Sequence, residues 1–134
     1  MGYPTTDFHV LMDQAEASFR KLNRIPDNYE VHFFNGGATL QFAAVPMNLL
    51  GREGGKASYL MSGHWSEKAV KEARMFCDDV EELNVDPQGL YFDYPAGKDW
   101  NIDPTSKYVH YTAADTRQGF EFQDFEYSAV PKGL

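Results

Sequence analysis

The first regular pattern of apolar positions follows Asp7 and repeats at steps of three and four residues, as on one face of an amphipathic helix. It comprises Phe8, Leu11, Met12, Ala15, Phe19 and Leu22. We expect Asp7 or Thr6 to cap this helix, because their side chains accept hydrogen bonds from the first backbone N–H groups. Pro26 and the turn-forming Asp27 are expected to end it.

A strand and a buried helix are predicted next. Residues 29–34, with the sequence YEVHFF, are short and rich in residues that favour strands. Two glycines follow, and then residues 40–50, LQFAAVPMNLL, predict an apolar helix. Pro46 is expected to interrupt this helix, because proline lacks a backbone N–H group, and Gly51 to end it.

The pattern repeats once more. Residues 57–63 predict a second strand, and residues 65–76 predict a helix that Ser66 opens and that has a charged outer face. Lys68 and Glu72 lie four positions apart and are expected to form an exposed helical pair. The acidic residues Asp78, Asp79, Glu81 and Glu82 are interpreted as a solvated helix end.

The last part of the chain favours strands. Residues 81–86 and 89–95 predict weaker ones, and residues 107–114 and 119–127 predict two more around a turn. Strand, helix, strand, helix and further strands indicate an α/β sandwich with a largely parallel sheet. Such a sheet needs cover on both faces. We therefore expect the 134 residues to be the beginning of a larger fold.

Composition narrows the classes of partner. The net charge is -8 and the isoelectric point is about 4.8, which disfavours nucleic acid and anionic membranes. No stretch is long and apolar enough to span a bilayer, and the amino terminus does not resemble a secretory signal. The single cysteine, Cys77, excludes an internal disulfide and suits a reducing compartment. We expect a cytoplasmic location.

Three features offer candidate chemistry, and each could instead have a purely structural role. Gly36, Gly37 and Thr39 stand between the predicted strand and helix, where unpaired helical N–H groups and a hydroxyl suit a phosphate; they also suit a simple glycine turn. Trp65 follows a strand and opens a helix, where it could stack on an aromatic cofactor ring or fill the core. Thr116 lies in another loop, as a donor to a ring substituent or as a turn residue.

Other sites are disfavoured. The four histidines and Cys77 have no metal-ligand spacing, so no metal site is predicted. There is no G-x-S-x-G elbow for serine hydrolysis, and nothing in the sequence indicates a reactive Cys77.

Several stretches together resemble phosphoserine aminotransferase, a class V pyridoxal-phosphate enzyme family of serine biosynthesis. They are IPDNYEVHFFNGGATLQFAAVPMNLLG, SGHWSEKAVKEA and WNIDPTSKYVHYTAADTRQGFEF, with TTDFHVLMDQAEASFRKL less clear. The resemblance implies that residues 1–134 form one partial aminotransferase large domain. It implies that Gly37, Ala38 and Thr39 cradle the phosphate of pyridoxal 5′-phosphate, that Trp65 stacks on its ring, and that Thr116 contacts the ring hydroxyl.

The family converts 3-phosphohydroxypyruvate and glutamate into phosphoserine and 2-oxoglutarate as a homodimer, and this chain departs from its pattern. Tyr3 and Pro4 replace a His-Arg pair that holds substrate anions, and Ala114 and Asp115 replace an Asn-Glu pair. We expect the aspartate that pairs with the pyridine nitrogen, the Schiff-base lysine and the small C-terminal domain to be absent.

Three hypotheses therefore stand. The chain is a truncated, divergent phosphoserine aminotransferase-like protein that is inactive alone, with no catalytic residue of its own. Alternatively, it is a non-catalytic binding or regulatory module that associates with itself or with a full-length aminotransferase. As a third possibility, another chain supplies the remainder of the enzyme. In each case self-association is expected, because a partial sheet exposes apolar area.

Overall fold

The computed structural model describes residues 5–91 and 96–134, and the chain divides into two units, Met1–Asn35 and Gly36–Leu134. The first unit contains helix α1, Thr6–Asn23. The predicted helix is confirmed, but its cap is Thr5, whose Oγ1 accepts from the N–H of Phe8 at 3.4 Å. Arg24 ends it in the left-handed conformation.

Residues 29–34 do not form the predicted strand. No neighbouring strand supplies hydrogen bonds to this segment within the described residues, and strand propensity alone does not hold an extended chain in a sheet. Arg20 instead fixes the start of the segment, because its Nη1 donates to the carbonyl of Tyr29 at 2.9 Å while its Nε pairs with Glu16 at 2.7 Å.

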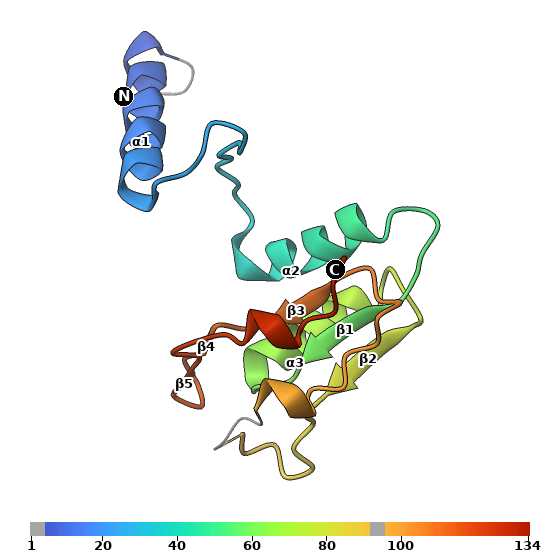
Figure 1. Cartoon of the computed structure of the whole chain (residues 1–134). Coiled ribbons are helices and arrows are strands. Elements are labelled where there is room, and N and C mark those ends of the chain that lie inside the picture. Colours follow the sequence, from blue (N-terminus) through green and yellow to red (C-terminus); the bar gives the residue numbers. More distant parts are fainter. Residues whose placement is uncertain (1–4, 92–95) are drawn as a thin grey trace. The chain divides into compact units, whose positions relative to one another are not determined.

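The second unit is an α/β structure around a parallel sheet of order β2-β1-β3 (Figure 1), as predicted. Its larger elements are α2 (Gly37–Leu49), β1 (Ala57–Leu60), α3 (His64–Ala73), β2 (Val80–Leu83) and β3 (Val109–Tyr111). A short antiparallel hairpin of β4 (Ala114–Asp115) and β5 (Phe120–Glu121) follows. The remaining elements are the single 3₁₀ turns η1 (Gly97–Asp99) and η2 (Tyr127–Ala129).

Several predicted boundaries are wrong for local reasons. Helix α2 runs through Pro46 to Leu49 without a break. The strand predicted for residues 119–127 is reduced to β5, because the aromatic side chains beyond it pack on one another, with the rings of Tyr111 and Phe125 stacked at 3.9 Å. Residues 89–91 form no strand, and residues 92–95 lie outside the described part.

The core lies between the sheet and the two helices α2 and α3. Its members are Leu50, Ala57, Tyr59, Met61, Ala69, Val70, Ala73, Cys77, Tyr91 and Tyr108, with Phe42, Val45 and Val80 at its margin. The buried hydroxyls of Tyr59 and Tyr108 satisfy each other at 2.7 Å. Ala57, Tyr59 and Met61 alternate along β1 and its end, as expected of side chains on one face of a strand.

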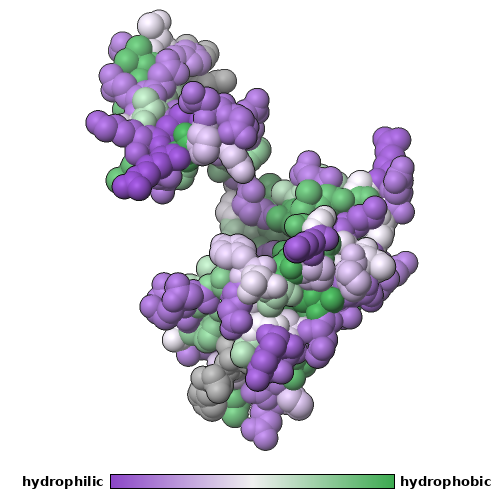
Figure 2. All heavy atoms as spheres, viewed as in Figure 1, coloured by the Kyte–Doolittle hydropathy of each residue, from purple (hydrophilic) through white to green (hydrophobic). Residues whose placement is uncertain are grey.

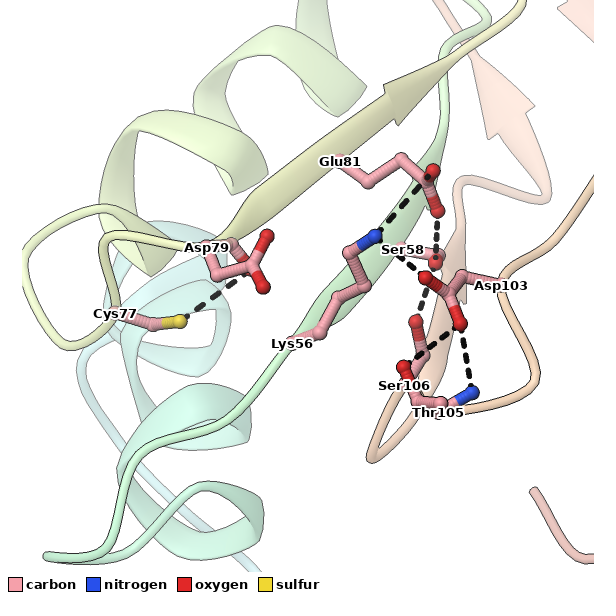
Figure 3. A network of polar contacts seen from close by, with 8 residues as sticks. All are labelled: Lys56, Ser58, Cys77, Asp79, Glu81, Asp103, Thr105 and Ser106. Atoms are coloured by element: carbon pink, nitrogen blue, oxygen red, sulfur yellow. Dashed lines mark hydrogen bonds and ion pairs between the residues drawn. The ribbon is translucent and has the colours of Figure 1, made fainter.

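A polar network ties the start of β1 to the segment before β3 (Figure 3). The ammonium of Lys56 lies 2.6 Å from Asp103 Oδ2 and 3.7 Å from Glu81 Oε1. Ser58 donates to Glu81 at 2.8 Å and lies 2.6 Å from the hydroxyl of Ser106. Glu81 and Glu82 lie on β2 and do not form a solvated helix end. Glu81 pairs with Lys56, and Glu82 pairs with Arg74.

His110 on β3 is a half-buried titratable side chain with aromatic neighbours. Its ring stacks on Tyr59 at 4.8 Å and meets the edge of Phe42 at 6.1 Å. Its Nδ1 has no hydrogen-bond partner among the described residues. Burial lowers the pKa of His110 to about 4, from about 6.5 in an unfolded chain, so the folded protein keeps the imidazole neutral.

This lowered pKa predicts a loss of stability in mild acid. Between pH 6.5 and 4 the unfolded chain binds a proton at His110 that the folded chain does not bind. The free energy of unfolding therefore decreases as the pH is lowered through this range. The full loss for this group is up to about 3 kcal/mol. In urea unfolding from pH 7.5 to 4.5, His110→Leu should remove this share of the pH dependence, and the exposed control His32→Leu should retain it. Equal slopes for both variants would contradict the prediction.

Candidate functional site

The candidate site is built where β1 and β3 end. Figure 1 shows α3 starting beyond the carboxyl end of β1, and the hairpin β4–β5 following β3. In open α/β sheets this edge collects loops and helix amino ends, and ligands bind there. Trp65 belongs to the first of these segments and Thr116 to the second.

A buried carboxylate joins the two segments. Asp115 is fully buried, and its Oδ2 accepts the backbone N–H of Trp65 at 2.8 Å. Its Oδ1 accepts the N–H of Arg117 at 3.0 Å and that of Gln118 at 3.4 Å. These donors, together with the positive amino end of α3, offset the cost of burying a charge.

The close approach of Asp115 requires a glycine at the start of α3. Gly63 caps the helix with φ 139°, and a Cβ there would lie 2.7 Å from Asp115 Oδ2. Ser66 does not open the helix as predicted, because it occupies the third helical position. Its hydroxyl accepts the N–H groups of Ser62 and Gly63 at 3.0 and 3.1 Å and donates to the carbonyl of Gly63 at 2.7 Å.

Trp65 and Thr116 lie in direct contact. The indole Nε1–H of Trp65 donates to Thr116 Oγ1 at 3.1 Å. Because this bond uses Thr116 as an acceptor, its own hydroxyl hydrogen remains available to a ligand. The ring of Trp65 is half-buried, so part of it faces solvent. Lys68 does not form the expected pair with Glu72 among the described ion pairs; its Nζ lies 5.4 Å from the Trp65 ring centroid.

The glycine turn opens α2. Gly36 caps this helix with φ 105°, and Gly37 follows with φ 64°. A Cβ at Gly36 would collide with the side chain of Leu40, whereas a Cβ at Gly37 would meet open space. No side chain caps the helix, and Gly37, Ala38 and Thr39 are exposed. This turn therefore presents its first N–H groups to solvent, as an anion site requires.

The structure thus brings Trp65 and Thr116 together, and it places Gly37, Ala38 and Thr39 at the start of the helix that packs against α3. Tyr3 and Pro4 lie outside the described residues. Sequence reasoning noted Asp115 only as a substitution and missed its structural role. An Asx turn at Asp115 could have been expected from its bond to the second residue after it, Arg117, but no local signal indicates its bond to Trp65.

No metal site competes with this one within the described residues. No three His, Cys, Asp or Glu side chains group in a way that could hold a metal ion. Within residues 5–91 and 96–134, no helix has both the length and the apolar character needed to cross a membrane.

Known proteins similar to this chain agree with one another. The family model for aminotransferase class-V matches residues 2–129. The phosphoserine aminotransferase of Acinetobacter baylyi is 42% identical over 135 residues, which cover 98% of this chain and 36% of the relative. That of Acidithiobacillus ferrooxidans is 43% identical over 123 residues, covering 91% of this chain and 33% of the relative. The chain therefore spans about a third of the length of these curated relatives.

Solved structures give the same result. The phosphoserine aminotransferase of Bacillus circulans subsp. alkalophilus superposes with a TM-score of 0.83 at 32% identity, over 93% of this chain and 34% of that one. A phosphoserine aminotransferase of Trichomonas vaginalis with bound pyridoxal phosphate superposes with a TM-score of 0.81 at 32% identity, over 93% of this chain and 37% of that one. The predicted aminotransferase fold is confirmed for the matched part.

Removing the carboxylate of Asp115 should disrupt this end of the molecule. Asp115→Ala leaves three N–H donors without their acceptor, and we expect a loss of about 2–4 kcal/mol in the free energy of unfolding. Trp65 should become more exposed, shown by red-shifted tryptophan fluorescence under native conditions. The control Asp124→Ala removes an exposed carboxylate and should change stability by less than about 0.5 kcal/mol. The same stability and emission in both variants would exclude this role.

Proposed function

Because the chain belongs to the aminotransferase class-V family, we propose that it binds pyridoxal 5′-phosphate as the cofactor-binding part of a phosphoserine aminotransferase-type protein. The observation that carries the proposal is the hydrogen bond from Trp65 to Thr116. It holds together the two residues that the resemblance assigns to the cofactor ring, although they lie on separate segments of the chain.

The start of α2 suits the cofactor's phosphate. The uncapped N–H groups of Gly37, Ala38 and Thr39 can donate to phosphate oxygens, and the helix dipole favours a negative charge there. The open space in front of Gly37 lets an anion approach the backbone closely. The Thr39 hydroxyl adds one more donor.

The segments at the end of the sheet suit the cofactor's ring. The half-buried indole of Trp65 offers an aromatic face, and its orientation is fixed through its own N–H and through Asp115. The free hydroxyl hydrogen of Thr116 is a donor for the ring oxygen. These groups bind and orient the ring. Orientation in advance reduces the loss of entropy that would otherwise add to the activation free energy of a reaction.

When bound, pyridoxal phosphate acts as an electron sink for amino-group transfer. We propose the family's reaction, from 3-phosphohydroxypyruvate and glutamate to phosphoserine and 2-oxoglutarate, for the protein in which these residues work. By themselves the 134 residues are expected to bind the cofactor without turnover, because the family's cofactor-linking lysine and ring-nitrogen aspartate have no match among them.

Cofactor binding is testable without activity. Pyridoxamine 5′-phosphate carries an amine in place of the aldehyde, so it cannot react with surface lysines. We expect it to quench tryptophan fluorescence saturably at micromolar concentration, to lose this effect in Trp65→Phe, and to be competed by inorganic phosphate. Trp100 also emits and serves as the internal reference in that variant.

A matched pair of variants tests the phosphate position. Gly37→Asp and Gly37→Asn have the same shape and both tolerate positive φ, but only the first places a negative charge beside the phosphate. Gly37→Asp should weaken binding by more than about tenfold relative to Gly37→Asn. Equal binding by the two variants, or no saturable quenching by the unmodified chain, would refute the proposal.

A second candidate role is association with another copy or with a full-length aminotransferase. Helix α2 carries three exposed apolar side chains, with Leu40 and Met47 on one side and Leu49 on another, which are 52%, 54% and 55% exposed. Figure 2 shows apolar side chains gathered over this helix. Exposed apolar side chains on a single helix favour burial against a partner.

This role predicts a charge-sensitive oligomer. Light scattering coupled to size exclusion should give a mass above 15.2 kDa for the unmodified chain. Met47→Glu and Leu49→Glu should return the chain to a monomer, because each buries a charge in the contact. Gln123 is exposed and lies on another segment, so it provides the control, and Gln123→Glu should still associate. A monodisperse monomer for the unmodified chain would exclude association with another copy, and no shift in mass on adding a full-length phosphoserine aminotransferase would exclude the second partner.

A further inference from the structure

Three basic side chains meet beside Trp65, and none of the roles described above uses them as a group. The Nη1 of Arg117 lies 3.2 Å from both ring nitrogens of His64. The His64 ring meets the edge of the Trp65 ring, with centroids 5.0 Å apart at 72°. Lys68 approaches the same indole at 5.4 Å. Arg117 and Lys68 are exposed, so a ligand can reach them.

No described ion pair occupies these three side chains, since none joins Arg117, His64 or Lys68 to a carboxylate within the described residues. Glu67 follows closely in sequence but lines a cleft with Tyr91. Asp115 lies underneath, fully buried, with its oxygens already accepting backbone N–H groups. In a chain of net charge -8, basic side chains gathered without acidic partners are available to an external anion.

The backbone that carries these side chains is fixed. The N–H of Arg117 donates to Asp115 at 3.0 Å, and the N–H of His64 donates to Gln118 Oε1 at 3.4 Å. The same carboxylate holds Trp65, between His64 and the rest of α3. A group whose backbone is held in advance loses less freedom when it binds a ligand.

The chemistry of the group selects an oxyanion. Within the described residues, Nε and Nη2 of Arg117 have no partner, so the guanidinium can still present paired donors. Such paired donors match a carboxylate or a phosphate. His64 and Lys68 add further donors or positive charge.

We propose that Arg117, His64 and Lys68 form an oxyanion-binding site at the edge of Trp65, which receives the carboxylate or phosphate group of a small acidic ligand. This site uses different residues from the cofactor-phosphate turn at Gly36–Thr39. It goes beyond the proposed function and stands whether or not the cofactor binds.

The test follows the two tryptophan indole N–H signals in ¹H–¹⁵N spectra of the full chain without cofactor. Inorganic phosphate and glutarate are the two probes, each added at constant ionic strength. The signal of Trp65 should move saturably with at least one probe, and the signal of the buried Trp100 should not. Saturation by glutarate alone identifies a carboxylate site, and saturation by phosphate alone a phosphate site.

Variants assign the response to residues. Arg117→Met should raise the apparent Kd by about tenfold or more, because it removes the paired donors. The matched control Arg52→Met removes an exposed arginine elsewhere, makes the same change in net charge, and should bind as the unmodified chain does. Arg117→Lys keeps the charge but not the fork, so its affinity should lie between the two. If Arg117→Met folds poorly, Arg117→Lys is the variant that tests the proposal, through its weaker binding than that of Arg52→Met.

The variant Gly37→Asp distinguishes anion binding at the cofactor-phosphate turn from anion binding at Arg117. A saturable response of Trp65 that survives Gly37→Asp and is weakened by Arg117→Met supports the oxyanion site, even if cofactor binding fails. A response abolished by Gly37→Asp and unaffected by Arg117→Met places the anion at the start of α2 and overturns the proposal. A response that follows ionic strength without saturating, or equal affinities for Arg117→Met and Arg52→Met, overturns it as well.

Discussion

The buried carboxylate of Asp115 is the interaction on which the candidate functional site depends. It lies in a short hairpin, yet it accepts the N–H of Trp65 at the start of α3 and those of Arg117 and Gln118 in its own loop. Gly63 is required because any side chain there would collide with that carboxylate. The positions of Trp65, of the Thr116 hydroxyl and of the basic side chains of the proposed oxyanion site all depend on this carboxylate.

A second carboxylate performs a similar task at the other end of β3. Asp103 precedes this strand and binds Lys56, the residue before β1, whose ammonium holds the pKa of Asp103 well below its usual range. Asp115 follows the strand and binds the residues after β1. Two acidic side chains therefore fix β3 against β1 at both ends, beyond what the ladder between Ser58 and Val109 supplies. The parallel register that places Thr116 beside Trp65 is specified twice.

Sequence reasoning succeeded where a pattern was local. The periodicity of α1 and the apolar run of α2 predicted those helices, and residues 57–63 predicted the strand β1. It failed where distant residues decide the outcome. Residues 29–34 have the composition of a strand but no described partner, and Glu81 was read as solvated because Lys56 and Ser58 reach it only in the folded sheet. The role of Asp115 depends on a contact with Trp65, fifty positions away, which no local pattern records.

The strand order β2-β1-β3 also determines at which stage of folding the candidate site can form. Strand β1 pairs with β2 through Ala57 and Val80, and with β3 through Ser58 and Val109. Because β3 is much further along the chain, the central strand gains its second neighbour only after a long loop has closed. Closing such a loop in a parallel arrangement is slow, because its entropy is lost before the contacts that compensate for it form. During synthesis α3 and Trp65 leave the ribosome well before Asp115 and Thr116. The contact between Trp65 and Thr116 therefore forms only after β3 has docked, and until then the nascent chain leaves Trp65 without this support.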